Sequence, residues 1–378
     1  MWELIKFELK KIFSNKLIYV VAFVLALIFT GVISRNLEIK NEFGGVDKFE
    51  SIANKYVSDK YSYEDFNELI NKAREKEQKD ENLNKDEKFL AHYANTIYKS
   101  NEDKKIVVNG DSYDYGSVVN LLDDMKSKDK EDSYEYKTLK KAKDIYDDSL
   151  KNDKSVYLGL WDNQLDFNVF ATLKVVLLVV GLSRIFTKEY SSKVSYLNLS
   201  SKKGRTSLNT AKLIAASIYG VITFAYVTAI SLLRSFPLGV HNGDAPLRAI
   251  NSTIVSNLSI KEYYFSCLAV SLFGTILISL LIIIISLLFK NTILSLGLPL
   301  ALMVMSGMIQ YQEYIGKYTT NFSIFHIIKG RALFDSYLTY DIFNNVVNYI
   351  SIEIMVGIVS LIIFMVVYRK FSKTQKIA

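Results

Sequence analysis

The sequence predicts an all-α polytopic membrane protein with six transmembrane helices, an N-terminal amphipathic helix and a large, mainly helical external domain. Hydrophobic residues make up 50% of the chain and charged residues 22%, so the two kinds must be segregated along it. Six continuous apolar runs are each long enough to cross about 30 Å of hydrocarbon, which takes roughly 20 helical residues. Continuous runs favour helices over a β-barrel, whose strands alternate. The runs cover 17–34, 167–186, 213–233, 263–289, 292–309 and 347–368.

Residues 1–16 predict an amphipathic helix that lies in the membrane interface. Trp2, Ile5 and Leu9 share one helical face, while Lys6 and Lys10 lie largely opposite, which suits a helix at the lipid headgroups. The alternative is a frayed tail. We interpret the apolar run that follows as a retained span, because it is longer than the apolar core of a signal peptide and no A-x-A-like cleavage site follows it.

Lys and Arg are distributed unequally between the two sides of the predicted bundle. The segments on the N-terminal side are strongly basic, whereas the loops on the other side balance basic with acidic residues. The positive-inside rule therefore places both termini in the cytoplasm of a multi-pass cell-membrane protein, with a bacterial plasma membrane expected. The net charge of +7 is explained by this asymmetry and does not indicate nucleic-acid binding. The basic segments are 1–16, 184–212, 290–291 and the cytoplasmic tail 369–378; the balanced loops are 235–262 and 310–346.

Residues 35–166 predict one large external domain. Runs such as YEDFNELINKAREKEQ and YEYKTLKKAKDIYDDSL space apolar residues by three and four positions, so we expect four or five amphipathic helices. The run IVVNGDSYDY predicts a β-hairpin with Asn109-Gly110 at its turn. No proline occurs in this region, which favours compact helices over a linker.

The sequence offers little that points to catalysis. Cys267 is the only cysteine, so the chain can form neither an internal disulfide nor a CxxC metal pair. His92, His241 and His326 have no companion at i+3 or i+4, which disfavours a zinc motif. The run SKKGRTS lacks the first glycine and the GK[ST] ending of a phosphate-binding loop. We therefore predict that the chain is not an enzyme and binds no metal or cofactor itself.

The predicted cytoplasmic loop 187–212 connects the second and third spans. Tyr190, Val194 and Leu197 distribute apolar groups through an otherwise polar, basic segment. This pattern is typical of a short amphipathic helix that offers a face to another protein. The alternative is a basic connector that only anchors its two spans.

The sequence resembles the permease subunits of the ABC-2 type transporter family, the membrane half of many bacterial ABC exporters. The resemblance is carried by LIKFELKKIFSNK before the first span and by KEYSSKVSYLNLSSKKGRTSLNTAKL between the second and third. The six-span order, with a close helical hairpin at Lys290-Asn291, adds to it. The resemblance covers all six spans but not the external domain, which is large for the family.

The resemblance implies that loop 187–212 contains a coupling helix that docks on an ABC ATPase subunit. Glu189 and Tyr190 match the family's acidic-aromatic pair, and Arg205 matches the Arg that follows a turn. The glycine usual after the acidic residue is replaced by Ser191-Ser192-Lys193. The predicted ATPase interface comprises Glu189, Tyr190, Val194, Leu197, Arg205 and Lys212. ATP and Mg²⁺ would be bound by the partner ATPase, and the other partners expected are membrane lipid and a second copy of this permease or a homologous one.

Residues 310–346 contain apolar clusters that are too short to span a membrane and too apolar for a free loop. We expect short re-entrant or interfacial helices there, rich in Tyr and Phe at the headgroup level, as the resemblance also implies. A folded cap that contacts the external domain is the alternative. Pro299, within the fifth predicted span, is expected to kink its helix.

Two ionisable residues fall inside predicted spans at matching depth, Lys174 in the second and Glu353 in the sixth. Charges in hydrocarbon are costly, so these side chains should face protein, water or each other. They could form a direct pair. Alternatively, Lys174 extends to the headgroups and Glu353 lines an outer vestibule.

The function that we predict is that of the permease subunit of an ATP-driven exporter for an amphipathic or hydrophobic substrate, with an antimicrobial or other peptide named first. A membrane sensor or secretion scaffold, whose external domain binds a ligand without transport, is the main alternative. A secondary transporter is disfavoured because no inverted repeat is visible and intramembrane charges are few.

Overall fold

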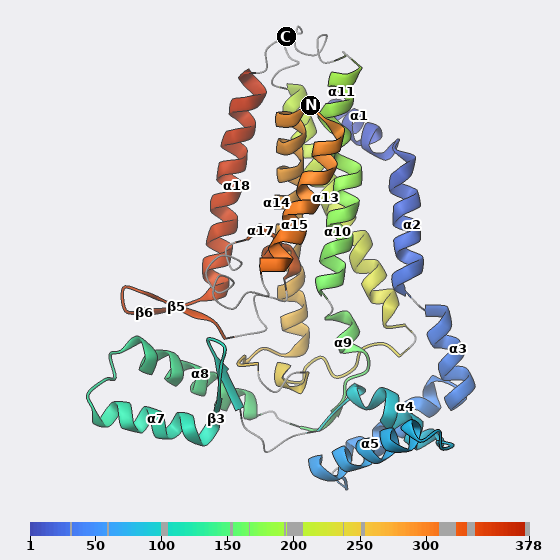
Figure 1. Ribbon diagram of the computed structural model, residues 1–378, viewed down its shortest axis with the longest axis vertical. Helices are drawn as coiled ribbons and strands as arrows, with labels where there is room; N and C mark the ends of the chain where they lie inside the picture. The colour runs from blue at the N-terminus through green and yellow to red at the C-terminus, as the bar shows by residue number, and fades with distance from the viewer. Residues whose placement is uncertain are drawn as a thin grey trace.

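The computed structural model of the protein is built mainly of helices (Figure 1). It describes residues 1–374 except 31, 59, 100–104, 152–153, 166, 193, 195–206, 237, 251–253, 310–322 and 331–336.

A bundle of long apolar helices forms the body of the molecule. Its members are α2 (Lys16–Thr30), α10 (Phe167–Leu182) continued by α11 (Arg184–Ser191), α13 (Asn209–Arg234), α14 (Ile260–Phe289), α15 (Thr292–Ile309) and α18 (Tyr349–Thr374). Leu and Ile dominate these segments, and the core between them includes Val175, Ala215 and Ile282, all fully buried. The helices α1 (Trp2–Phe13) and α18 have their free ends at the same end of the bundle, which we call the termini end (Figure 1).

In the described part of the chain, four helices are long and apolar enough to cross a membrane: Phe167–Ser191, Asn209–Arg234, Ile260–Phe289 and Tyr349–Ser372. A fifth candidate is the pair formed by α1 and α2, which is bent by 62°. The apolar helix α15 is shorter than these. The mainly helical membrane architecture agrees with the sequence, whereas the fifth predicted span, 292–309, stays a prediction. The first span, expected over 17–34, corresponds to a helix that ends at Thr30.

A first lobe lies at the opposite end of the bundle and is built from the chain after α2. It contains α3 (Val32–Phe43), α4 (Val46–Val57), α5 (Tyr63–Gln78), α6 (Lys85–Tyr93), a turn of 3-10 helix (Ala94–Thr96) and β1 (Ile97–Tyr98), which pairs antiparallel with β4 (Val156–Tyr157). Edge-to-face aromatic contacts form its core, with the ring centroids of Phe43 and Phe49 5.0 Å apart. Leu238, from the segment after α13, completes that core.

A second lobe follows in the chain. It contains the antiparallel hairpin β2 (Lys105–Val108) and β3 (Asp111–Asp114), then α7 (Tyr115–Ser127) and α8 (Tyr134–Leu150). Asn109 and Gly110 form the hairpin turn with φ angles of 54° and 93°, so the predicted hairpin is confirmed. The lobe's core draws Val255 and Tyr337 from distant parts of the chain.

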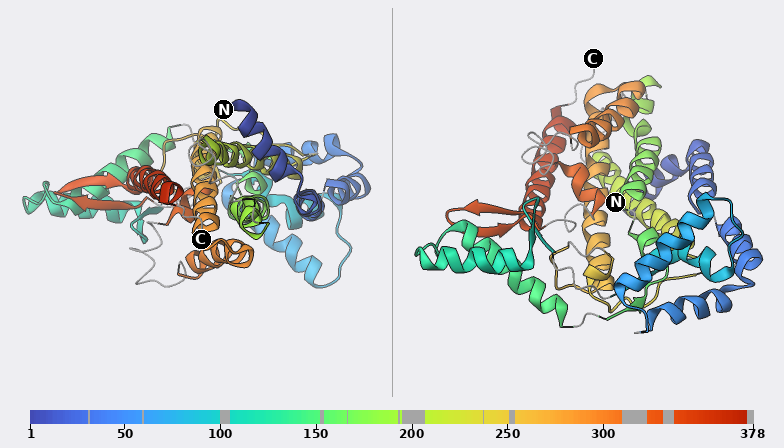
Figure 2. Two further views of the ribbon diagram at one scale, coloured as in Figure 1. Left: turned by 90° about the horizontal axis from the view of Figure 1, so that it is seen from above. Right: turned by 60° about the horizontal axis from the view of Figure 1, so that its bottom comes forward.

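The region expected to be one external domain over 35–166 therefore contains two separate cores, because the apolar faces of α7 and α8 pack on their own hairpin and not on α4 to α6. Figure 2 shows the two lobes extending to opposite sides of the bundle. Each core takes side chains from outside the region, so neither lobe is complete without the rest of the chain. Short elements connect the lobes to the bundle: α9 (Trp161–Gln164) and a 3-10 turn (Leu247–Ala249).

The segment expected to be re-entrant or interfacial, 310–346, is described only in part. It contributes the short helix α17 (Ile324–Lys329) and a hairpin of β5 (Thr339–Ile342) and β6 (Asn345–Asn348). The hairpin joins the second lobe, where Tyr134 Oη and Thr339 Oγ1 lie 2.7 Å apart. The contact of this hairpin with the second lobe fits the folded-cap alternative, while α17 packs inside the bundle against α14 and α18.

The approach of α17 to α14 depends on a glycine. A Cβ atom added to Gly274 would lie 2.4 Å from the backbone nitrogen of Ile328, a separation that only backbone movement could relieve. The backbone of α17 can approach α14 closely at Gly274 because glycine has no side chain.

We predict that Gly274→Ala destabilises the protein by about 1–3 kcal/mol, as overpacking does in tightly packed cores. The melting temperature of the detergent-solubilised chain measures this. Gly297→Ala in α15 is the matched control, because a Cβ there meets nothing within 4 Å and alanine favours a helix. An equal loss of stability in both variants would contradict a close contact specific to α17.

Candidate functional site

The helix α11 lies at the termini end, where it meets several helices of the bundle. It continues α10 after Ser183, and its buried face consists of Ile185, Phe186, Thr187 and Glu189. Apolar residues fix most of this face against the bundle, so the acidic Glu189 is carried inward with them. A buried carboxylate requires compensating partners.

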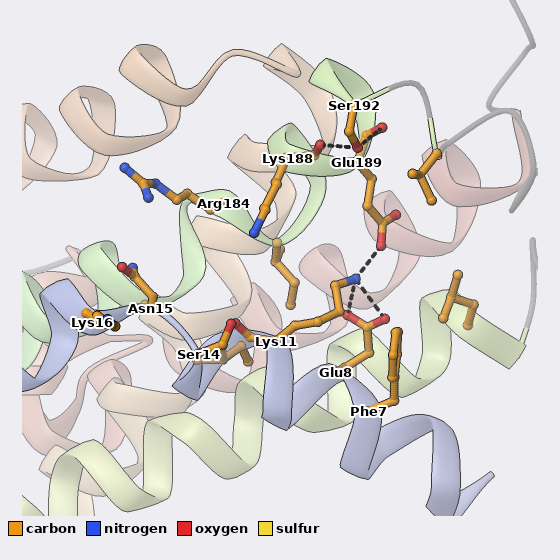
Figure 3. Close-up of a pocket in the computed structure, with 15 residues that line it drawn as sticks. Phe7, Glu8, Lys11, Ser14, Asn15, Lys16, Arg184, Lys188, Glu189 and Ser192 are labelled. Atoms are coloured by element: carbon orange, nitrogen blue, oxygen red, sulfur yellow. Dashed lines mark hydrogen bonds and ion pairs between the residues drawn. The ribbon is translucent and has the colours of Figure 1, made fainter.

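Glu189 receives these partners from two other helices; Figure 3 shows the contact with Lys11 of α1. Lys11 Nζ of α1 donates to Glu189 Oε1 at 2.5 Å and to Glu8 Oε2 at 3.0 Å. Lys212 Nζ of α13 donates to the second oxygen of Glu189. Glu8 and Lys11 are one helical turn apart, which brings both to the same side of α1. We call Glu8, Lys11, Glu189 and Lys212 the ion quartet.

The ion quartet carries no net charge, and three of its members are buried while Lys11 is partly exposed. Glu8 is 0% exposed and Lys212 1% exposed, and Lys212 Nζ also lies 4.1 Å from the ring centroid of Phe186. Two carboxylates and two ammonium groups cancel, so the cluster satisfies its charges internally. Removing one member of such a buried set leaves an uncompensated charge, which typically costs about 3–5 kcal/mol.

The opposite side of α11 is attached to the turn between α14 and α15. Ser286 Oγ donates to the carbonyl oxygen of Ser183 at 3.0 Å, and Thr292 Oγ1 donates to Thr187 Oγ1 at 3.0 Å. Lys290, at the turn itself, places its ammonium 4.5 Å from the ring centroid of Tyr190. The helix α11 is therefore held between α1 and α13 on one side and the α14–α15 turn on the other.

A cavity of about 410 Å³ opens beside the ion quartet, where α1 bends into α2. Its walls come from the end of α1, the start of α2 and the outer side of α11 (Figure 3). Asn15 anchors the bend, because its side-chain amide donates to the carbonyl oxygen of Val180 at 3.1 Å. Basic side chains on its walls include Lys16, Arg184 and Lys188.

The structure places the predicted interface residues in two different settings. Glu189 and Lys212 are buried and paired with each other in the ion quartet, and the expected contact of Glu189 with an ATPase stays a prediction. Tyr190 is half-buried, and Val194 is 43% exposed. Leu197 and Arg205 lie outside the described residues.

Sequence reasoning missed Glu8 and Lys11 as members of this site. The available signal was Glu8 itself, an acidic residue within a basic amphipathic helix, on the face that also carries Ile5 and Ile12, both buried. A charge among buried apolar neighbours indicates a partner from another element.

Lys174 and Glu353 do not pair with each other in the described part of the chain. Lys174 Nζ donates to Ser271 Oγ and, at 3.4 Å, to the carbonyl oxygen of Ile328. Glu353 Oε1 instead accepts from Tyr349 Oη at 2.8 Å, within its own helix. Lys174 thus donates to a carbonyl at the C-terminal end of α17, where the last carbonyls of a helix favour a cation. The direct-pair hypothesis is corrected accordingly.

The other residues singled out in the sequence are Pro299, Cys267 and the possible metal ligands. Pro299 lies inside α15. Cys267 is buried without a disulfide. Among the residues that the structure describes, no group of three or more His, Cys, Asp or Glu side chains could hold a metal ion.

The family model described as ABC-2 family transporter protein matches residues 13–370. No curated protein matches the chain.

We predict that Glu189→Gln and Lys212→Met each destabilise the protein by about 3–5 kcal/mol, because each leaves an unbalanced buried charge. The double variant Glu189→Met with Lys212→Met should be more stable than either, since the Glu8–Lys11 pair stays neutral. Melting in detergent measures these changes. Glu3→Gln is the control, because its ion pair with Lys6 is exposed and should contribute at most about 1 kcal/mol. Additive losses in the double variant would argue against the quartet.

We predict that Lys174→Glu and Glu353→Lys each reduce the yield of folded protein, and that combining them restores nothing. The reason is that each residue serves a different partner, Ile328 for Lys174 and Tyr349 for Glu353. Size-exclusion chromatography of the detergent extract measures the folded fraction. A double variant that recovers most of the loss would show that the two side chains pair after all.

Proposed function

This chain belongs to the ABC-2 transporter family, and we propose that it is the membrane subunit through which a separate ATPase drives export of an amphipathic or hydrophobic substrate. Membership of the family makes it a permease of an ABC transporter in a multi-pass membrane setting. Export and the substrate class belong to the proposal.

One observation supports coupling through α11 in particular. One side of α11 is fastened to the bundle by the ion quartet and the opposite side by the α14–α15 turn, while Lys188 is exposed on the helix and Val194 is exposed just beyond its end. A docking element needs this combination, because a force applied to the outer side must reach the spans without loss. The ATPase would contact the outer side of α11 and the segment that follows it.

The contacts of α11 define where a displacement would travel. Glu189 connects it to α1 through Lys11 and to α13 through Lys212. Thr187 connects it to the start of α15. ATP-driven closure of the partner subunits would move α11, and these three connections would shift the spans between two packed arrangements.

We propose that ATP and Mg²⁺ are bound by the partner ATPase and that this chain catalyses no reaction itself. The support is the sequence, which lacks the glycine pattern of a phosphate-binding loop. A second copy of the permease, or a homologous one, would complete the pathway. The helix α18 offers a surface for it, because Ile354, Ile358 and Ile362 are about half exposed along one side.

We propose that the two lobes, at the end of the bundle opposite the termini end, select the substrate. A surface cavity of about 630 Å³ lies between α5 and β1 in the first lobe. Asn67, Arg74 and Tyr98 are among the residues that line it, and amide, cationic and aromatic groups suit a peptide's backbone, carboxylates and side chains. An antimicrobial or other peptide is the substrate that we propose first.

We predict that an ABC ATPase copurifies with the chain in mild detergent and that Val194→Asp at least halves substrate-stimulated ATP hydrolysis by the complex. An acidic side chain would replace an apolar contact on the docking side of α11 without touching the ion quartet. Phe343→Asp is the matched control, because Phe343 is 96% exposed on the β5–β6 turn at the other end.

The same purification tests the proposed function as a whole. Reproducible absence of an ATPase, with another cytoplasmic protein bound instead, would replace the exporter by the sensor or scaffold. An ATPase that binds and responds normally to the Val194→Asp variant would keep the exporter but remove α11 as its docking element.

A further inference from the structure

The cavity at the α1–α2 bend lies at the boundary between polar and apolar chain. Lys16 immediately precedes the apolar residues of α2, and Arg184 is the first charged residue after the apolar run of α10 that follows Lys174. Both residues line the cavity. In a membrane this level corresponds to the lipid headgroups, where Lys and Arg mark the ends of spans.

The cavity has an excess of positive charge. Its two carboxylates, Glu8 and Glu189, are already neutralised within the ion quartet. Lys16, Arg184 and Lys188 are exposed cations that have no carboxylate within ion-pair distance in the described part of the chain. Figure 3 shows Lys188 extending from α11 toward α1, and Arg184 on the same side of the cavity as Asn15 and Lys16.

Apolar side chains flank the opening. Phe7 on the cavity wall is 57% exposed. Leu17 and Val20, which follow the lining residue Lys16 in α2, are 47% and 57% exposed. An exposed apolar flank beside a cationic cavity matches a ligand with a charged head and an apolar tail. The volume of about 410 Å³ suits a phosphate with a small polar headgroup, while acyl chains would remain on the flank.

We propose that this cavity binds the headgroup of an anionic glycerophospholipid. Arg184, Lys188 and Lys16 would donate to the phosphate oxygens, Arg184 through its planar fork. Ser14 and Ser192 also line the cavity. Their hydroxyl groups donate to the carbonyl oxygens of Lys11 and Lys188, so their oxygens remain acceptors for headgroup hydroxyls such as those of glycerol.

Such a lipid would bridge two elements that the ion quartet also connects, the α1–α2 bend and α11. Binding would therefore favour the arrangement in which α1 lies against α11. This proposal concerns lipid binding by the chain alone and does not depend on the proposed docking of an ATPase.

The test is lipid binding by the full-length chain in neutral detergent, followed by native mass spectrometry. Dioleoyl phosphatidylglycerol and dioleoyl phosphatidylcholine are titrated separately, with glycerol 3-phosphate as a soluble competitor. The variant is Lys16→Gln with Arg184→Gln, which leaves Lys188 and Val194 intact. The matched control is Arg369→Gln with Lys370→Gln, two exposed cations near the end of α18 at the same end of the bundle.

We expect preferential binding of phosphatidylglycerol, weakened about 30-fold in the cavity variant and little changed in the control, since each basic residue near an anionic surface contributes about fivefold. The charge-preserving variant Lys16→Arg with Arg184→Lys should bind phosphatidylglycerol more tightly than the Gln variant but less tightly than the unaltered chain, because it keeps both charges and loses the planar fork of Arg184. This comparison separates lost charge from misfolding. Melting of all variants without added lipid should be the same.

Three results would overturn the proposal. Equal weakening in the control would show a general attraction of the basic end for anionic lipid. Competition by glycerol 3-phosphate at the affinity of the lipid would indicate a site for a soluble phosphate. Unchanged phosphatidylglycerol binding by the cavity variant, together with loss of the copurifying ATPase, would make the cavity a protein-docking site.

Discussion

A carboxylate carried into the apolar bundle is the constraint on which the termini end depends. Glu189 follows the buried face of α11 inward, and its charge must be met there because burial removes most of its hydration. Lys11 and Lys212 meet it from α1 and α13, two helices separated by most of the external region in sequence. The positions of α1, α11 and the start of α13 therefore all depend on the same cluster of charges.

The same physical logic operates deeper in the bundle with different partners. Lys174 is buried at 3% exposure, yet no carboxylate among the described residues serves it. The hydroxyl of Ser271 and the carbonyl oxygen of Ile328 in the short helix α17 accept hydrogen bonds from it instead. Because α17 brings backbone carbonyls into the interior, it both requires a cation and supplies the place for one. The close contact of α17 with Gly274 of α14 and its hydrogen bond from Lys174 both involve Ile328, so each contact holds α17 in the position that the other requires.

The sequence predicts well those features that depend on local pattern. Continuous apolar runs gave the long helices, and Asn109-Gly110 gave a hairpin, because each signal lies within a few consecutive residues. The partner of Lys174 was not predictable in this way. The sequence positions of Lys174 and Glu353 predict a similar depth in the membrane, but they do not predict in which direction each side chain points. That direction depends on the packing of α17, whose six residues carry no clear periodicity. Likewise, the apolar pattern of α11 showed an amphipathic helix but not that Glu189 belongs to its inner face, and the two cores of the external region depend on Leu238, Val255 and Tyr337 from far away.

The neutrality of the ion quartet has an electrical consequence. A charge that moves through the field of an energised membrane exchanges about 2.3 kcal/mol per elementary charge for each 100 mV that it crosses. Glu8, Lys11, Glu189 and Lys212 are two positive and two negative charges bound to each other, so the ion quartet itself would contribute no net gating charge if α1, α11 and α13 were displaced together. Any voltage dependence of such a displacement would come from other charges on these helices, such as Arg184 and Lys188.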